Sequence, residues 1–208
     1  QLGNNSTTNS SVPVPVSVPT TGVLSGKTVV AVSVGDRHSV ALCSDGTLAA
    51  WGWNFYGQLG NNRTWDTSNG STNRWVPVAV TATGALSGKT VVAISAGGDH
   101  TVALCSDGTI ASWGSNDYGQ LGHNGISYVD VPVTVAATGA LSGKSVVAVS
   151  AGSYHTVALC SDGTMAAWGS NSIGQLGNNS TTDSRVPVAV TTTGVLSGKT
   201  VVSVSAGF

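Results

Sequence analysis

The apolar residues of this chain gather in short segments that are separated by Gly, Asp, Asn and Ser. Around the third quarter of the chain four such segments follow one another: Val131–Val135, Ser145–Ser150, His155–Cys160 and Met165–Gly169. Short apolar runs bounded by turn residues predict β-strands, which we call strands a to d. An Asp-Gly pair stands between strands c and d, and flanked in this way it favours a tight hairpin. We therefore expect four short antiparallel strands in this part of the chain.

The same pattern recurs along the whole chain. Gln-Leu-Gly begins at residues 1, 58, 120 and 175, and Ser-Gly-Lys begins at residues 25, 87, 142 and 197. A spacing of roughly 55–60 residues with four strands per unit is typical of a β-propeller blade. The predicted fold class is all-β, with propeller blades of four antiparallel strands and about three and a half blades in this chain. We expect one tandem-repeat segment over 1–208, with repeats near 1–57, 58–119 and 120–174 and a partial repeat over 175–208.

Composition supports the all-β class and argues against nucleic-acid binding and against a membrane-spanning helix. The chain has 28 Gly, and charged residues make up 8% of it, against about 25% in typical domains. Eight Lys and Arg against nine Asp leave no strongly basic face, so we expect no nucleic-acid partner. No apolar run approaches the length of a membrane-spanning helix, so we expect no membrane span. The first residues carry no basic and apolar leader, and we expect any secretion signal to be absent from this segment.

These motifs resemble a known repeat family. The order is Trp-Gly-x-Asn-x-x-Gly-Gln-Leu-Gly, then Val-Pro-Val, then Ala-Gly-x-x-His-(Thr/Ser)-Val-Ala-Leu, then Asp-Gly, and it is similar to the regulator of chromosome condensation repeat. The resemblance extends over the entire chain and implies a seven-bladed propeller. It also implies functions that include guanine-nucleotide exchange, other protein-protein contacts and, in a distant bacterial relative, inhibition of β-lactamase. Fold carries over between relatives better than function does.

Several chemically interesting residues sit at identical positions in the repeats. A ring of imidazoles could bind metal, but equivalent positions on successive blades are too far apart, and we expect histidines that bond to turn carbonyls. Tryptophan in strand d is expected to pack between blades. The aspartates are expected to cap their Asp-Gly turns rather than act in catalysis, and the three cysteines to be free and buried. These structural repeat positions are His38, His100, His155, Trp51, Trp113, Trp168, Asp45, Asp107 and Asp162; we predict no catalytic residue, metal or cofactor.

Residues that differ between the repeats are the better candidates for function. They gather after strand d, in the loop that leads to the next strand a, which carries an insertion over 63–75, and in the turn between strands b and c. Aromatic side chains and arginines in loops on a rigid frame are typical of binding hot spots, although ordinary loop variation is the alternative. The candidate binding residues are Trp53, Phe55, Tyr56, Arg63, Trp65, Arg74, Trp75, Tyr118 and Tyr154.

Together these observations predict a non-enzymatic repeat scaffold that presents variable loops to a protein or surface ligand. One alternative is a partner-specific regulator, such as an exchange factor or an enzyme inhibitor; a second is an enzyme that uses the propeller channel. We expect a segment of a longer array, completed by further repeats or other chains, with open edges that favour self-association. Low charge, Asn-, Ser- and Thr-rich loops and the resemblance to bacterial family members suggest an extracellular or cell-envelope location.

Overall fold

The computed structural model describes residues 1–63 and 72–207, and every regular element in this part is a β-strand or a single 3₁₀ turn. Strands c and d of the third repeat have the predicted bounds, and strands a and b are shifted by one or two residues. The strands are β1 (Val29–Val34), β2 (His38–Cys43), β3 (Leu48–Gly52), β4 (Arg74–Ala79), β5 (Val91–Ala96), β6 (His100–Cys105), β7 (Ile110–Gly114), β8 (Val129–Thr134), β9 (Val146–Ala151), β10 (His155–Cys160), β11 (Met165–Gly169) and β12 (Ser184–Ala189). The 3₁₀ turns are η1 (Gly84–Leu86), η2 (Gly139–Leu141) and η3 (Gly194–Leu196).

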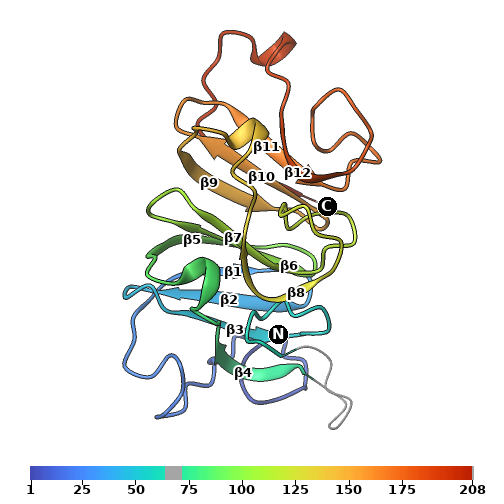
Figure 1. The fold of residues 1–208 in the computed structure, drawn as a ribbon. Helices are drawn as coiled ribbons and strands as arrows, with labels where there is room; N and C mark the ends of the chain where they lie inside the picture. The colour runs from blue at the N-terminus through green and yellow to red at the C-terminus, as the bar shows by residue number, and fades with distance from the viewer. Residues whose placement is uncertain (64–71, 208) are drawn as a thin grey trace.

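The strands form three four-stranded antiparallel sheets, in the orders β1-β2-β3-β4, β5-β6-β7-β8 and β9-β10-β11-β12. Figure 1 shows these sheets stacked as three successive blades, which we call blades 1, 2 and 3. The all-β prediction and the four-stranded blades are confirmed.

Repeats and blades are out of phase, which the sequence analysis did not foresee. Strand a was grouped with the b, c and d strands that follow it, whereas β8 pairs with β7 of the blade before it. Each blade therefore consists of strands b, c and d of one repeat and strand a of the next. Residues 12–18 and 201–205 repeat the sequences of strands a and b but lie outside the assigned strands. In the repeating pattern their partners would be a preceding d and a following c, which the 208 residues do not contain.

The core lies between the blades. One cluster joins the Val40, Leu42 and Leu48 face of blade 1 to Ala103 and Trp113 of blade 2. A second cluster joins the corresponding face of blade 2 to Ala158, Cys160 and Trp168 of blade 3. Leu86 of η1 and Leu141 of η2 complete these clusters. Strands β2, β3, β6 and β7 are buried along their whole length because both faces of these middle strands are covered.

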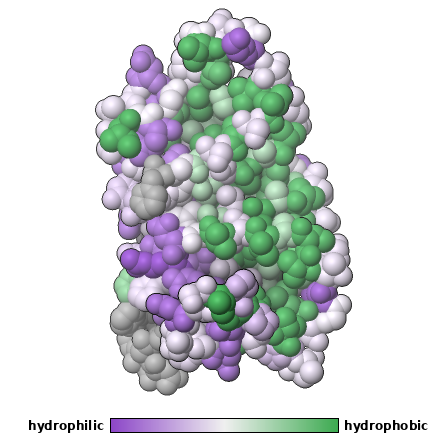
Figure 2. Space-filling model, turned by 180° about the vertical axis from the view of Figure 1, so that it is seen from behind, coloured by the Kyte–Doolittle hydropathy of each residue, from purple (hydrophilic) through white to green (hydrophobic). Residues whose placement is uncertain are grey.

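The first strands of the blades converge along one side of the stack. Strands β1, β5 and β9 contact one another in sequence, and the Ser33 and Ser95 hydroxyls accept hydrogen bonds from the backbone N–H groups of Ala96 and Ala151 on the next blade. Seen from behind, hydrophobic side chains form a band across the stacked blades (Figure 2). We call β1, β5 and β9 the inner strands. Their exposed apolar residues are Val29, Val30, Val32, Val34, Val92 and Val147.

Glycines allow the turns between the first two strands of each blade to approach one another. A Cβ added at Gly97 would lie 2.3 Å from the carbonyl oxygen of Gly152 and 2.4 Å from Cε1 of His100. Gly35 is enclosed in the same way by Gly97 of the next blade, and Gly152 by Gly207 of the C-terminal segment. These contacts explain the Ala-Gly element that the repeats share.

Substituting Gly97 with alanine is expected to lower the free energy of unfolding by about 2–3 kcal/mol, because the added methyl group forces two blades apart. Gly207 holds the same repeat position, yet nothing lies within 4 Å of a Cβ built there, so Gly207→Ala is the matched control and should change little. Urea denaturation of both variants measures the difference. Equal stability of the two variants would contradict the proposed role of the glycines.

Candidate functional site

The turns and loops that vary between repeats lie at one end of the blades. In blade 1 the strand register pairs His38 with Gly52 and Gly52 with Arg74, so the start of β2, the end of β3 and the start of β4 lie together. The same register recurs in blades 2 and 3. We call this end the loop face; it consists of the turns over 35–37, 97–99 and 152–154 and the described parts of the loops that follow β3, β7 and β11.

Aromatic side chains on the loop face contact one another in two groups. Trp53 stacks on Phe55 with ring centroids 6.0 Å apart, and Phe55 meets Tyr56 edge to face at 4.9 Å. Tyr56 in turn lies 6.3 Å from Tyr128, which belongs to the loop of the next blade. We call these four residues the aromatic chain. Because Phe55 and Tyr128 remain 37% and 46% exposed, the aromatic chain presents apolar surface to solvent.

The second group is the tyrosine pair, which consists of Tyr118 and Tyr154. Their ring centroids lie 5.2 Å apart, one from the loop of blade 2 and the other from the inner turn of blade 3. Both side chains are exposed, at 41% and 45%. Tyrosine in such a position offers a rigid ring with a polar end, which suits an interface.

The remaining candidate binding residues have different surroundings. Trp75 and Arg74 were expected in the loop, but β4 begins two residues earlier than the Val-Pro motif suggested and includes both of them. Trp75 is 50% exposed on this strand. Arg74 donates to the backbone oxygen of Asn73, and burial, followed by the charge of Arg63, lowers its pKa. Trp65 lies outside the described residues.

The sequence analysis missed Tyr128 and included Arg37 only as part of the variable turn between strands b and c. Tyr128 stands at the repeat position of Asn73 and Asp183, where no other copy is aromatic. Comparison of the copies could therefore have found it. The Arg37 guanidinium lies 5.7 Å from the ring centroid of Trp53, a cation–π contact.

The repeated histidines, tryptophans and Gln-Leu-Gly elements join each blade to the next. The Thr101 hydroxyl of β6 donates to the backbone oxygen of Gln58 at 2.9 Å, and Trp113 Nε1 donates to the same oxygen at 3.0 Å. His38 Nε2 lies 2.8 Å from Thr101 Oγ1. Since the hydroxyl proton points to the carbonyl, His38 must donate its Nε2 proton to Thr101. Gly60 allows this loop to lie on the indole, because a Cβ there would be 2.7 Å from Trp113 Nε1.

This network recurs between blades 2 and 3. Thr156 and Trp168 both donate to the backbone oxygen of Gln120, and His100 Nε2 lies 3.0 Å from Thr156 Oγ1. At the N-terminal side Trp51 donates to the backbone oxygen of Gln1 at 2.7 Å. The histidines were expected to bond to turn carbonyls; instead His38 and His100 each bond to a threonine hydroxyl of the next blade, a contact between segments that are far apart in the sequence.

Burial holds these histidines in the neutral form. Desolvation lowers the pKa of His38 to about 4, and the pKa of His100 to about 3 with further contributions from His38 and His155. The Nδ1 atoms of His38 and His100 are buried without a hydrogen-bond partner. A proton added there would have no acceptor in place. The two imidazoles therefore act as neutral structural groups at physiological pH.

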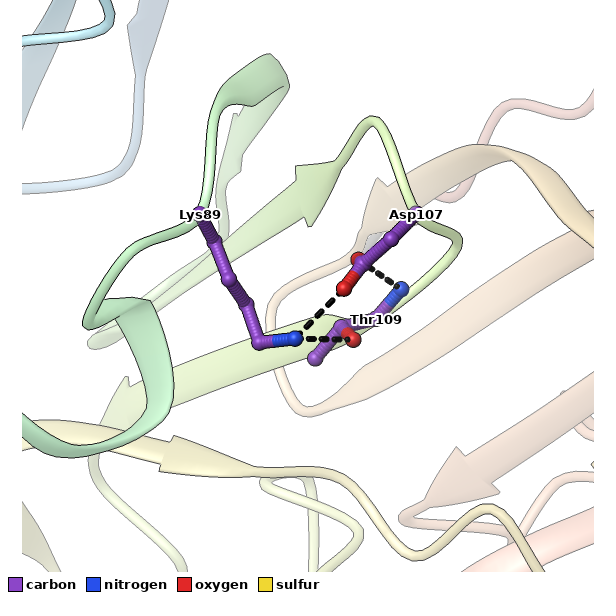
Figure 3. Close-up of polar contacts among 3 residues, drawn as sticks. All are labelled: Lys89, Asp107 and Thr109. Atoms are coloured by element: carbon purple, nitrogen blue, oxygen red, sulfur yellow. Dashed lines mark hydrogen bonds and ion pairs between the residues drawn. The ribbon is translucent and has the colours of Figure 1, made fainter.

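The repeated aspartates hold hairpins at the opposite end of the blades. Asp107 Oδ1 accepts from the backbone N–H of Thr109 at 2.9 Å, and its other oxygen pairs with Lys89 Nζ at 2.5 Å (Figure 3). Lys89 also donates to the Thr109 hydroxyl at 3.0 Å. The hydrogen bond from Lys89, followed by that from the Thr109 backbone, lowers the pKa of Asp107 to about 2. Asp45 and Asp162 pair with Lys27 and Lys144 in the same manner. Each carboxylate thus accepts a backbone hydrogen bond within its own hairpin and pairs with the lysine of the preceding Ser-Gly-Lys turn.

The three cysteines are free and buried, and burial raises the pKa of each thiol. A raised pKa keeps the thiol protonated and unreactive at neutral pH. Within residues 1–63 and 72–207, no group of three or more His, Cys, Asp or Glu side chains is placed to hold a metal ion. Nor does this part of the chain contain a helix long and apolar enough to cross a membrane.

Comparison with known proteins agrees with the repeat structure. The profile named Regulator of chromosome condensation (RCC1) repeat matches residues 1–42, 45–104, 107–159 and 162–207. A second profile of the same repeat matches residues 29–58, 91–120 and 146–175.

Two relatives are much longer than this chain. It is 34% identical over 190 residues to the Ultraviolet-B receptor UVR8 of Arabidopsis thaliana, an alignment that covers 91% of this chain and 39% of the receptor. It is 35% identical over 178 residues to the E3 ubiquitin-protein ligase HERC2 of Homo sapiens, covering 86% of this chain and 3% of the ligase. The chain therefore spans less than half the length of either relative.

Two solved structures share the fold. Prp20p from Saccharomyces cerevisiae superimposes with a TM-score of 0.72 at 24% identity, over 86% of this chain and 42% of that one; that structure is described with binding to Gsp1p and histones. Human WBSCR16 superimposes with a TM-score of 0.72 at 27% identity, over 88% of this chain and 44% of that one.

Proposed function

Because this chain belongs to the Regulator of chromosome condensation (RCC1) repeat family, we propose that it is a non-enzymatic scaffold that binds a protein partner through its loop face. The observation that carries the proposal is the exposed aromatic chain together with the tyrosine pair. Exposed rings that pack on one another are pre-ordered, so a partner can bury them with little loss of side-chain entropy. The described binding of Prp20p to Gsp1p and histones supports a protein partner for a blade of this fold.

The side chains that could act in catalysis have surroundings that support a non-enzymatic role. His38 and His100 are neutral and buried, the thiols of the cysteines are protonated and buried, and Asp107 is paired with Lys89. None of these groups is placed as an activated nucleophile or a free general base. This arrangement also argues against the alternative of an enzyme that uses the propeller channel.

A partner-specific regulator, such as an exchange factor or an enzyme inhibitor, is the second form of the same proposal. It is favoured by the asymmetry of the loop face, since the aromatic chain occurs in the loops of blades 1 and 2 and has no counterpart in blade 3, where Ser170 and Ser172 replace Trp53 and Phe55. A generic scaffold would tolerate equal loops on every blade. A regulator of one partner requires a local set of contacts.

Further repeats or other chains are also proposed as partners that complete the propeller. The exposed valines of β1, including Val32 at 68% and Val34 at 71%, support this part of the proposal, because apolar strands of this kind are normally covered. We also propose an extracellular or cell-envelope location, for which the low charge and the polar loops are the support.

The double substitution Tyr118→Ala/Tyr154→Ala tests the protein-binding function. Removal of two aromatic anchors is expected to weaken partner binding at least tenfold, since hot-spot residues contribute about 2 kcal/mol or more each. Val195→Ala is the control, because Val195 is 86% exposed on η3, at the opposite end of the blades. Partners captured with the wild-type protein are purified, and their dissociation constants are measured for all three proteins. Unchanged affinity of the double variant for every partner would contradict the proposal.

A further inference from the structure

A cavity of about 170 Å³ opens on the loop face of blade 1, beside the aromatic chain. Trp53 and Trp75 line it, together with Arg37 and Asn73. The N-terminal segment supplies the rest of the lining, including the neutral polar residues over 6–9. A volume of this size is smaller than the cavities that accept drug-sized ligands, so it suits a single ring.

The electrostatic character of the cavity is set by one cation. Arg37 has the charged side chain of the described lining, and its guanidinium forms no hydrogen bond or ion pair within the described part of the chain. Asp36 and Asp99 lie nearby and neither lines the cavity; Asp99 accepts a hydrogen bond from Gln58 Nε2 at 2.8 Å. The Nε1 atom of Trp53 is buried and also lacks a partner in the described residues. The lining thus has a cationic side chain and no carboxylate among its described residues, which favours an anionic ligand.

The other blades show that the scaffold does not require this set of residues. Equivalent positions follow from the strand register and the repeated motifs, and none of the three residues recurs. Arg37 is replaced by Asp99 and Tyr154, Trp53 by Ser115 and Ser170, and Trp75 by Asp130 and Arg185. Blades 2 and 3 have the same strand pairing without them. The combination of Arg37, Trp53 and Trp75 is thus specific to blade 1. Because the blade fold does not require these side chains, they are available for binding a ligand.

We propose that this cavity binds one carboxylate-bearing sugar ring of the hexuronate class. The ring lies against the indole of Trp75, which is 50% exposed, with Trp53 in the wall of the cavity, and the carboxylate of the sugar pairs with Arg37. Hydroxyl and amide side chains over 6–9 and at Asn73 suit sugar hydroxyls, which both donate and accept hydrogen bonds. A strongly acidic peptide would require several cations, and the lining offers one. This site lies beyond the proposed protein-binding function; it shares Trp53 with the aromatic chain and does not include the tyrosine pair.

Methyl glucuronide and methyl glucoside are the probes, because they differ in the carboxylate alone. Binding is followed by the indole N–H resonances of Trp53 and Trp75 in ¹⁵N-resolved spectra, with the buried Trp113 and Trp168 resonances as a check that each variant is folded. We expect the glucuronide to bind about tenfold more tightly than the glucoside and to shift the Trp53 and Trp75 signals, in line with the strength of a charge-assisted pair.

Three variants separate the contributions. Arg37→Gln is expected to abolish the preference for the glucuronide and keep weak binding of both sugars. Trp75→Ala is expected to weaken both sugars by a similar factor. The double substitution Tyr118→Ala/Tyr154→Ala should leave both sugars unchanged, so a failure of this proposal and a failure of the protein-binding proposal are distinguishable.

Several outcomes would overturn the sugar proposal. Equal affinity for the two sugars would remove the role of Arg37, and equal shifts with sodium acetate would indicate a simple anion site. Shifts of the two indoles by an Asp- and Glu-rich peptide, without shifts by the glucuronide, would assign the cavity to a protein ligand instead. Absence of any shift at millimolar glucuronide would also contradict it.

Discussion

Replacing Trp113 with alanine is expected to lower the free energy of unfolding by about 4 kcal/mol, because loss of a fully buried indole leaves a large cavity in the first inter-blade cluster. The backbone oxygen of Gln58 also loses one of its two donors, although Thr101 still bonds to it. Gly60 packs directly against the Trp113 indole. The loop that contains Gly60 and joins blade 1 to blade 2 should therefore become less ordered as well. Urea denaturation followed by far-UV circular dichroism measures the change.

Trp75→Ala is the matched control for this prediction. It removes the same side chain from a strand position that is 50% exposed, so the cavity term is absent and the change should stay within about 1 kcal/mol. Equal losses for Trp113→Ala and Trp75→Ala would show that the inter-blade network contributes little to stability.

Acidification from pH 7 to pH 5 is expected to lower the free energy of unfolding by about 4 kcal/mol through His38 and His100 together. Each imidazole has an unfolded pKa near 6.5, whereas burial lowers the folded pKa to about 4 for His38 and about 3 for His100. Above pH 6.5 both states are neutral and stability is unaffected. Below it the unfolded chain binds protons that the folded chain excludes, so stability falls as the pH falls, by about 1.4 kcal/mol per pH unit for each group. The fall ends where the folded imidazoles themselves titrate.

The pH window separates the contribution of the histidines from that of the aspartates. Asp107 has a lowered pKa, so its stabilising contribution is present above its unfolded pKa and is lost only below about pH 4. The variant His38→Gln/His100→Gln should lose most of the fall between pH 6.5 and pH 5, whatever its stability at pH 7; a smaller slope remains because burial also lowers the pKa of His155. NMR titration of the wild-type imidazoles is the independent check: a midpoint for His38 or His100 near 6.5 would refute the explanation.

Much of the fold follows from local patterns. The bounds of β10 and β11 match the predicted strands because apolar runs and the Asp-Gly turn between them are local signals. Periodicity could not set the phase of the blades, since a repeating pattern can be divided into units at any point. The pairing of β8 with β7 decides it, and that pairing is a tertiary contact across a long loop.

The candidate site was predictable in part. Phe55 and Tyr118 were found because the copies of the repeat differ there, whereas Tyr128 was overlooked in a loop with few other signals. The contacts Tyr56–Tyr128 and Tyr118–Tyr154 each join two neighbouring blades, so the stacking of the blades creates them. The same holds for the cavity, in which the N-terminal segment meets Trp53 and Trp75.

The sequence by itself determined the strands, the turn residues and the four-stranded repeat, because these depend on interactions between residues close along the chain. Only the tertiary structure decided which strands share a blade and why the histidines are neutral. It also decided which variable side chains meet. The bond between His38 and Thr101 shows the reason: its two residues lie 63 positions apart and come together only when one blade packs on the next.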